Sequence, residues 1–174
     1  MKKMLALLCA VLLLAASCAF ADAPVVEFRE KIQLGGSIPE GYRFTLLEQQ
    51  ELSMCGQVVS DDPAAPCLEV FIAFNESYAA AESLKDLDEN AVNIIKQGFS
   101  EEYDVTFGQF ETASGDSLLL IRDNGGRFVD FYTVCLGHEI ELTLFPAEGQ
   151  TLTDAQVNSC LELMRTLDIV PVLG

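Results

Sequence analysis

Apolar and polar residues alternate with a period of two over several short stretches of this chain, the spacing that places apolar side chains on one face of a β-strand. Between residues 67 and 74, for example, Leu68, Val70 and Ile72 belong to the more apolar of the two faces. Clusters of glycine, proline and aspartate separate these stretches, as expected of turns. The pattern predicts strands over residues 27 to 34, 42 to 50, 52 to 59, 67 to 74, 103 to 111, 117 to 122, 127 to 135 and 139 to 145.

Two segments change to the helical period of about 3.6 residues. The first begins at Ser83, a candidate N-cap with Asp86 three residues later, and runs to about Gly98. The second begins with a capping box at Thr153 and runs to about Leu167. Tight hairpins in place of helical crossovers predict an α+β domain, in which two amphipathic helices pack on an antiparallel sheet of about six to eight strands.

The first 21 residues predict a signal peptide. Lys2 and Lys3 precede an apolar run over residues 4 to 16, which is too short to span a membrane, and residues 19 to 21 form an A-x-A cleavage site. Cleavage at that site would leave residues 22 to 174 as a single exported domain.

The same segment has a competing interpretation. Residues 14 to 18 resemble the lipobox of bacterial lipoproteins, in which the cysteine, here Cys18, becomes lipidated and begins the mature chain. Three positions before Cys18 the chain has Ala15, where lipoboxes usually have leucine. Both interpretations predict an extracytoplasmic protein, secreted or associated with the cell envelope, without a membrane span.

The chain is strongly acidic, with 27 acidic and 10 basic side chains and a formal net charge of −17. A charge of this size repels phosphate backbones and anionic membrane surfaces, which excludes nucleic-acid binding. Removal of the first 21 residues takes away two lysines and no acid, so Lys31, Lys85 and Lys96 are the only lysines left. The acidic surface favours solubility and attracts basic partners and divalent cations.

Four cysteines remain after the signal peptide, namely Cys55, Cys67, Cys135 and Cys160. An even number in an exported chain predicts two disulfides. Side-chain parity places Cys55 and Cys67 on the polar face of two strands joined by a turn, so we expect them to pair. Cys135 and Cys160 lie on facing apolar surfaces of a strand and the last helix, and we expect them to pair too. The intervals between the cysteines do not match a zinc site, and the sequence predicts no metal and no cofactor.

His138 is the only histidine and lies in a predicted turn. In that position it is a candidate general base. No nucleophile motif accompanies it, however, and we interpret it as an exposed turn residue whose replacement by alanine leaves the fold nearly unchanged.

Two acidic motifs are also candidates. Residues 86 to 90 match positions 1, 3 and 5 of an EF-hand loop, but Ala91 and Gln97 stand where calcium binding needs glycine and glutamate, so we interpret the motif as the first turn of a helix. Glu139 and Glu141 lie about 7 Å apart on one face of a strand, a spacing that suits two catalytic carboxylates. We interpret them as the solvent-facing side of a half-buried strand, and we predict no catalytic residues.

The order of elements carries a resemblance. Residues 37 to 42, Ser-Ile-Pro-Glu-Gly-Tyr, lead into a strand, an amphipathic helix lies in mid-chain, and the last helix ends in residues 166 to 169, Thr-Leu-Asp-Ile. This order resembles the Mog1/PsbP-like fold of small extracytoplasmic bacterial proteins over nearly all of the mature chain. The resemblance implies a non-catalytic binding or accessory protein and supplies no functional residues. Cys55 and Cys67 are not part of the general pattern of that fold.

These observations lead to two functional hypotheses. The first is an exported non-catalytic module that binds an unidentified protein, peptide or envelope component and is stabilised by two disulfides. The alternative is a small secreted hydrolase with a site at His138 or at the carboxylates. An open apolar surface would favour the first hypothesis, whereas a closed pocket that gathers His138 or several acids would favour the second.

Overall fold

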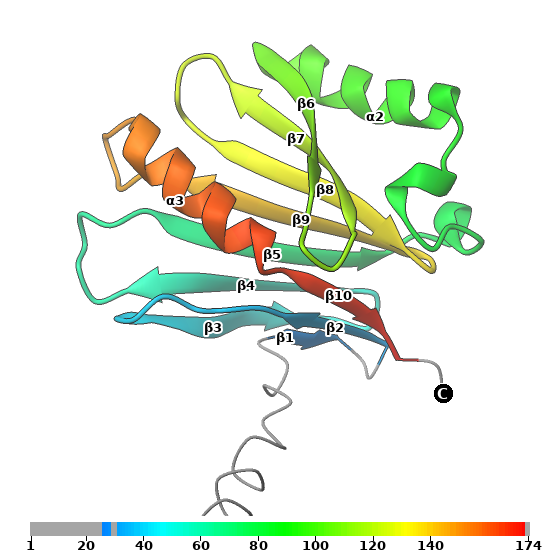
Figure 1. Cartoon of the computed structure of the whole chain (residues 1–174), viewed down its shortest axis with the longest axis horizontal. Helices are drawn as coiled ribbons and strands as arrows, with labels where there is room; N and C mark the ends of the chain where they lie inside the picture. Colours follow the sequence, from blue (N-terminus) through cyan, green and yellow to red (C-terminus); the bar gives the residue numbers. More distant parts are fainter. Residues whose placement is uncertain (1–25, 29–30, 173–174) are drawn as a thin grey trace, which may run out of the picture.

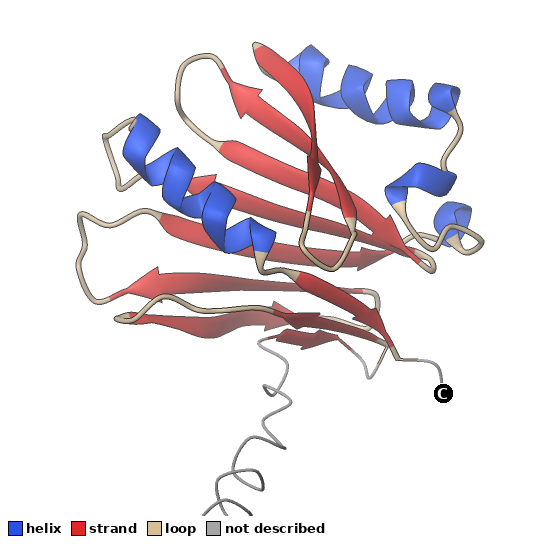
Figure 2. Cartoon of the chain, in the orientation of Figure 1, coloured by secondary structure: helices blue, strands red, loops and turns tan. Residues whose placement is uncertain are grey.

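The computed structural model describes residues 26 to 28 and 31 to 172, which form two β-sheets, two α-helices and two short 3-10 helices (Figures 1 and 2). The larger sheet has seven strands in the order β3-β4-β5-β9-β8-β7-β6, and the smaller one has three in the order β1-β2-β10. All neighbouring strands are antiparallel, which confirms the predicted α+β class. The predicted signal peptide, its cleavage site and Cys18 lie outside the described residues.

The strands are β1 (Val26–Phe28), β2 (Ile32–Gly35), β3 (Tyr42–Gln49), β4 (Ser53–Ser60), β5 (Cys67–Phe74), β6 (Val105–Glu111), β7 (Ser117–Asp123), β8 (Val129–Cys135), β9 (His138–Phe145) and β10 (Asp168–Pro171). The helices are η1 (Glu76–Tyr78), η2 (Leu84–Asp86), α2 (Glu89–Glu102) and α3 (Asp154–Arg165).

One predicted strand is in fact a hairpin. The stretch from residue 27 to 34 forms β1 and β2, in which Val26 lies opposite Leu34, and the Lys31 N–H donates to the Phe28 carbonyl at the reversal. Phe28 and Ile32 are both buried and stand four positions apart, so the spacing of buried residues stays even and conceals the reversal.

The two helix starts differ in how well the sequence marks them. Thr153 forms the predicted capping box and begins α3. Ser83 also forms a capping box, with Asp86, but it opens the 3-10 helix η2, and Asp88 is the N-cap of α2. The first helix therefore begins later than predicted, because two N-cap residues follow each other within one short segment.

Both faces of the large sheet are covered in part. On one face, here called the α3 face, α3 and the small sheet pack over β4, β5, β8 and β9, and Figure 1 shows α3 continuing into β10 as it crosses the sheet. On the opposite face, the α2 face, α2 and η2 pack over β6, β7 and β8. Among the described residues, no helix is long and apolar enough to cross a membrane.

Candidate functional site

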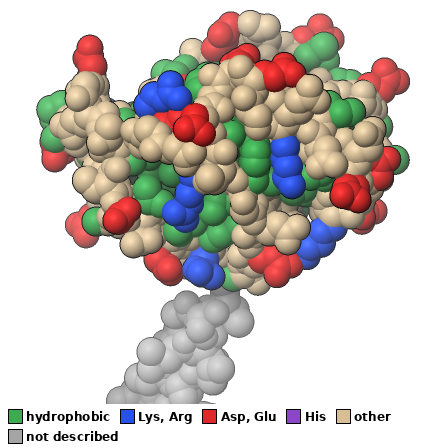
Figure 3. Space-filling model, turned by 90° about the horizontal axis from the view of Figure 1, so that it is seen from above, with side chains coloured by type: hydrophobic (Ala, Val, Ile, Leu, Met, Phe, Trp, Pro, Cys, Tyr) green, Lys and Arg blue, Asp and Glu red, His purple; other side chains and the backbone are tan. Residues whose placement is uncertain are grey.

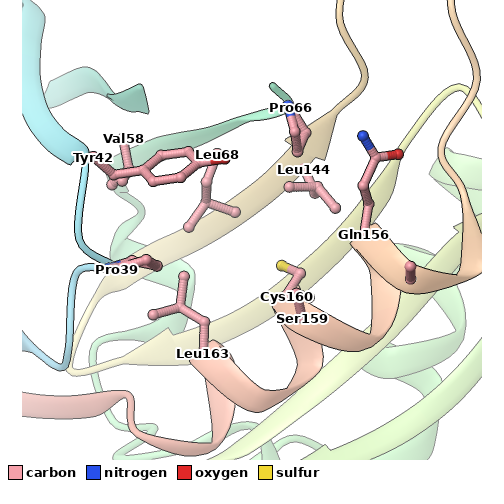
Figure 4. A pocket seen from close by; sticks show the side chains of 11 residues that line it. Pro39, Tyr42, Val58, Pro66, Leu68, Leu144, Gln156, Ser159, Cys160 and Leu163 are labelled. Carbon is pink, nitrogen blue, oxygen red and sulfur yellow. The ribbon is translucent and has the colours of Figure 1, made fainter. Parts of the chain in front are cut away.

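A groove of about 380 Å³ lies between α3 and the strands β4, β5 and β9 (Figure 4). Its strand side consists of Val58, Leu68 and Leu144, which the period of two directs to the α3 face. Its helix side consists of residues spaced by three or four along α3, the spacing of one helix face. The lining residues are Pro39, Tyr42, Val58, Pro66, Leu68, Leu144, Ala155, Gln156, Ser159, Cys160 and Leu163.

The lining of the groove carries no formal charge. Its polar groups come from Tyr42, Gln156, Ser159 and Cys160. The Gln156 side-chain oxygen accepts the Thr153 N–H at 2.9 Å within the capping box. Burial raises the pKa of the Cys160 thiol to about 12, so this thiol stays protonated and neutral at physiological pH. The groove therefore suits an uncharged apolar group.

The groove continues as a narrower hollow beneath the small sheet. This hollow has a volume of about 50 Å³ and shares Val58, Leu68 and Leu163 with the groove. It extends toward Leu34, which belongs to β2, and toward Ile38, which follows that strand. The wide part next to α3 is the part large enough to receive a ligand group.

His138 lies in the core and not on an exposed turn, so the predicted exposure is wrong. His138 is 6% exposed. Its ring packs edge-on against the rings of Phe28 and Phe74, with centroid distances of 5.8 and 5.6 Å. The Nδ1 atom lies 3.2 Å from the Cys135 carbonyl oxygen. The described residues give His138 aromatic and backbone neighbours rather than a nucleophile.

The two candidate carboxylates on β9 are half-buried rather than freely solvated. The Asn75 amide donates to Glu139 Oε1 at 2.7 Å. Burial, together with the charges of Glu139 and Glu69, raises the pKa of Glu141. Asp130 on β8 is another acid on the face of Glu139 and Glu141, 1% exposed, and the sequence analysis did not single it out. Its apolar neighbours in β8 gave no sign of a buried charge.

Acidic residues do not converge on a cation site in the described part of the chain, where no three His, Cys, Asp or Glu side chains surround one point. The EF-hand-like residues have structural roles instead. Asp86 accepts the N–H of Ser83 at 2.9 Å, and Asp88 accepts the N–H of Ala91 at 2.7 Å. The interpretation of this motif as the beginning of a helix is confirmed for Asp88.

The predicted pairing of Cys55 with Cys67 is wrong, because both are free thiols. They do lie on the same face of the sheet, as parity predicts, but Cys55 is opposite Phe71 in the β4–β5 ladder. Four residues separate Phe71 from Cys67, a distance of about 13 Å at strand geometry. A disulfide needs Cα atoms about 4.4 to 6.8 Å apart.

Cys135 and Cys160 are also free, and both are buried in the predicted core. Cys135 lies opposite His138 at one end of β9. Cys160 lines the groove beside Leu144 near the other end of that strand. The interval of six residues along β9 between these positions corresponds to about 20 Å, which is too far for a disulfide. All four cysteines are therefore free thiols, where the sequence predicted two disulfides.

A comparison with protein-family models and with curated proteins finds no match to the chain. The groove is therefore interpreted from its own residues. Sequence reasoning assigned Leu68 and Cys160 to apolar faces but did not identify the space between those faces. That space depends on how far α3 stands from the sheet, which no local pattern encodes.

Proposed function

We propose that this protein is an exported, non-catalytic binding module that receives an uncharged apolar group in the groove between α3 and the large sheet. The observation that carries the proposal is the lining of the groove, in which eleven residues contribute no formal charge to a space of about 380 Å³. Small-molecule sites typically measure about 300 to 1,000 Å³ and combine an apolar lining with a few polar groups. An aromatic ring or a short alkyl chain fits this description.

The polar groups suggest how such a ligand is oriented. Ser159 is exposed on α3 and contributes a hydroxyl group at the edge of the groove, whereas Cys160 is 5% exposed and lies deeper. A ligand with one apolar end and one uncharged polar end would bury the first against Leu68 and Leu144 and leave the second near Ser159. A neutral envelope component has this chemistry, and so does an apolar side chain of a partner protein together with the uncharged peptide group beside it.

The N-terminal segment and the order of elements support an accessory role outside the cytoplasm. Residues 1 to 21 have the sequence of a signal peptide, with a lipid anchor at Cys18 as the alternative. The sequence resembles the Mog1/PsbP-like fold, whose members are mostly binding or accessory proteins. We propose that this chain has the same fold. The hydrolase alternative lacks a comparable observation, because His138 is buried among Phe28 and Phe74.

The groove is tested with N-phenyl-1-naphthylamine, an uncharged probe whose fluorescence increases in apolar sites. We expect saturable binding to the purified protein. A Ser159→Trp variant should lose most of this binding because the indole fills the groove, whereas Asn158→Trp, also exposed on α3 but not part of the lining, should retain it. Absence of saturation, or equal binding by the two variants, would overturn the proposal.

Export is tested separately by the intact mass of the protein recovered from an exporting bacterial host. A chain that begins at Asp22 supports free secretion. A chain that begins at a lipid-bearing Cys18 shows an anchored form that is still extracytoplasmic. An uncleaved cytoplasmic chain would contradict the proposed location.

A further inference from the structure

The hollow beneath the small sheet extends the groove along α3. On the helix, the lining of the groove runs from Ala155 to Leu163, a distance of about 12 Å at the helical rise per residue. The lining of the hollow begins at Leu163 and continues through Met164 to Leu167, which follows the helix. Figure 4 shows Leu163 at the end of this row of α3 side chains, away from Gln156. Groove and hollow therefore form one elongated space, wide near the start of α3 and narrow near its end.

The walls of the narrow end are mainly apolar. Leu34 and Val70 line it and are each 2% exposed. Thr166 also lines it, but the Thr166 hydroxyl already donates to the Leu163 carbonyl at 2.8 Å and accepts the Ser37 N–H at 3.2 Å. Apolar cavities exclude ordered water, so a ligand carbon that enters the hollow gains contacts without displacing a bound water.

The uncharged polar groups lie at the wide end, where Tyr42, Gln156 and Ser159 belong to the lining. Acidic side chains are scattered over the face that Figure 3 shows, in agreement with the formal net charge of −17. A negatively charged head group is repelled by such a surface. The wide end therefore favours a head group that is polar and uncharged, such as a hydroxyl.

The size of the narrow end selects the shape of the ligand. A volume of about 50 Å³ holds about three or four groups of the size of a water molecule. The end of an unbranched alkyl chain fits into this space, whereas a six-membered ring is too wide for it. A ring would stay in the groove and leave the hollow empty.

We propose that groove and hollow together bind a single-chain amphiphile, whose uncharged head group lies near Ser159 and whose alkyl chain passes Leu163 into the hollow. This inference rests on the function proposed for the groove and specifies the ligand as an unbranched chain, as opposed to an aromatic ring or a partner's side chain. Each methylene that enters the hollow should raise the affinity about fourfold, the effect of burying one CH₂ group.

The test compares two alcohols with the same number of carbon atoms, 1-decanol and 4-cyclohexyl-1-butanol, as competitors of N-phenyl-1-naphthylamine. We expect the protein to bind 1-decanol about tenfold more tightly, because the ring of its isomer stays outside the hollow. Decanoate, which has the same chain length and a charged head group, should bind more weakly than 1-decanol. Equal affinities for the two alcohols, or tighter binding of decanoate, would overturn the inference.

Ile38→Trp tests where the chain ends. Ile38 is half-buried and lines the hollow but not the groove, so the larger side chain should fill the hollow and make the two alcohols bind about equally. Ile94→Trp makes the same change at a residue of α2 that is 61% exposed and lines neither space, and it should keep the preference for 1-decanol. A preference that persists in Ile38→Trp would show that the chain does not enter the hollow and would overturn the inference. Melting temperatures verify that both variants are folded.

Failure of this inference differs from failure of the proposed function. Saturable binding of N-phenyl-1-naphthylamine without a preference between the two alcohols would keep the groove as a binding site and overturn only the chain-shaped ligand. Absence of saturable binding by the unmodified protein would overturn both.

Discussion

Asp130 lies directly opposite Thr143 in the β8–β9 ladder, and the Thr143 hydroxyl donates a hydrogen bond of 2.8 Å to Oδ1 of Asp130. The second carboxyl oxygen, Oδ2, is the one buried side-chain polar atom of the described residues without a partner. Burial, and then the charge of Glu141, raise the pKa of Asp130 to about 8. This carboxyl is therefore protonated in the folded protein at neutral pH.

The protonated carboxyl makes stability depend on pH. An unfolded aspartate ionises near pH 4, whereas folded Asp130 keeps its proton up to about pH 8. The folded state binds more protons between these values, so Asp130 makes the free energy of unfolding fall as pH rises, by up to about 1.4 kcal/mol per pH unit. Asp130→Asn removes this dependence, and urea unfolding at pH 5, 6 and 7 measures it.

The control is Glu40→Gln, which removes one acid from an exposed position. We expect the stability of Glu40→Gln to follow that of the wild type with pH, whereas Asp130→Asn gives a flatter dependence and gains relative stability at pH 7. Parallel curves for all three proteins would show that Asp130 is ionised throughout this range.

Local patterns predicted the strand faces well because parity depends only on neighbouring residues. Cys55 and Cys67 lie on the predicted face, but their pairing also required the β4–β5 hairpin to be centred on Asp61. The observed pair of Val58 with Leu68 centres the hairpin on Pro63 instead. Register is set by the geometry of the whole loop, which the composition of residues 61 to 66 leaves open.

Free thiols lead to a direct prediction. Burial raises the pKa of Cys135 to about 11 and also raises the pKa of Cys55 and Cys67. Thiolates are the reactive form, so all four cysteines should react slowly with iodoacetamide in the folded protein, with half-exposed Cys55 and Cys67 ahead of the buried pair. In denaturant without reductant, mass spectrometry should find alkylation at all four.

The same thiols predict that a reducing agent leaves the melting temperature unchanged. A disulfide typically contributes about 2 to 4 kcal/mol, so its reduction would lower the melting temperature by several degrees. Alkylation of only two cysteines in denaturant, or a large fall in the melting temperature on reduction, would show that one of the predicted disulfides forms.

His138 shows a different limit of sequence reasoning. Its position after Gly137 correctly indicated a hairpin turn, and Gly137 has a positive φ of 81°. The strand β9 begins at His138 itself, and the parity of β9 turns the side chain toward Phe28, a residue some 110 positions earlier in the chain. Long-range packing of β1 against the end of β9 determined the burial, and no residue near His138 encodes it.

The buried ring changes the expected effect of substitution. His138→Ala should lower the free energy of unfolding by about 2 to 3 kcal/mol, because it leaves a cavity between Phe28 and Phe74. His138→Phe keeps the ring and loses the contacts of Nδ1 with the backbone carbonyls, so a smaller loss is expected. Urea denaturation measures both variants. If His138→Ala lowers the free energy of unfolding by less than about 0.5 kcal/mol, His138 is an exposed residue, as the sequence predicted.

Gly56 on β4 leaves room for the ring of Phe44 on β3. A Cβ at position 56 would overlap that ring, at 2.5 Å from Cε2, and would lie 3.1 Å from the Thr45 carbonyl oxygen. Gly56→Ala should therefore displace Phe44 and destabilise the protein by about 1 to 3 kcal/mol. Gly98→Ala is the matched control, because a Cβ there meets nothing within 4 Å and α2 gains about 0.5 to 1 kcal/mol from the better helix former.

The double variant with Phe44→Ala shows where the Gly56→Ala cost arises. If it comes from the ring, Gly56→Ala should cost clearly less when Phe44 is already alanine, and the two changes should be non-additive by about 1 kcal/mol or more. Additive losses in urea unfolding would instead assign the cost to the Thr45 carbonyl, which both backgrounds retain. The coupling therefore measures how firmly the edge strand β3 holds Phe44 over Gly56.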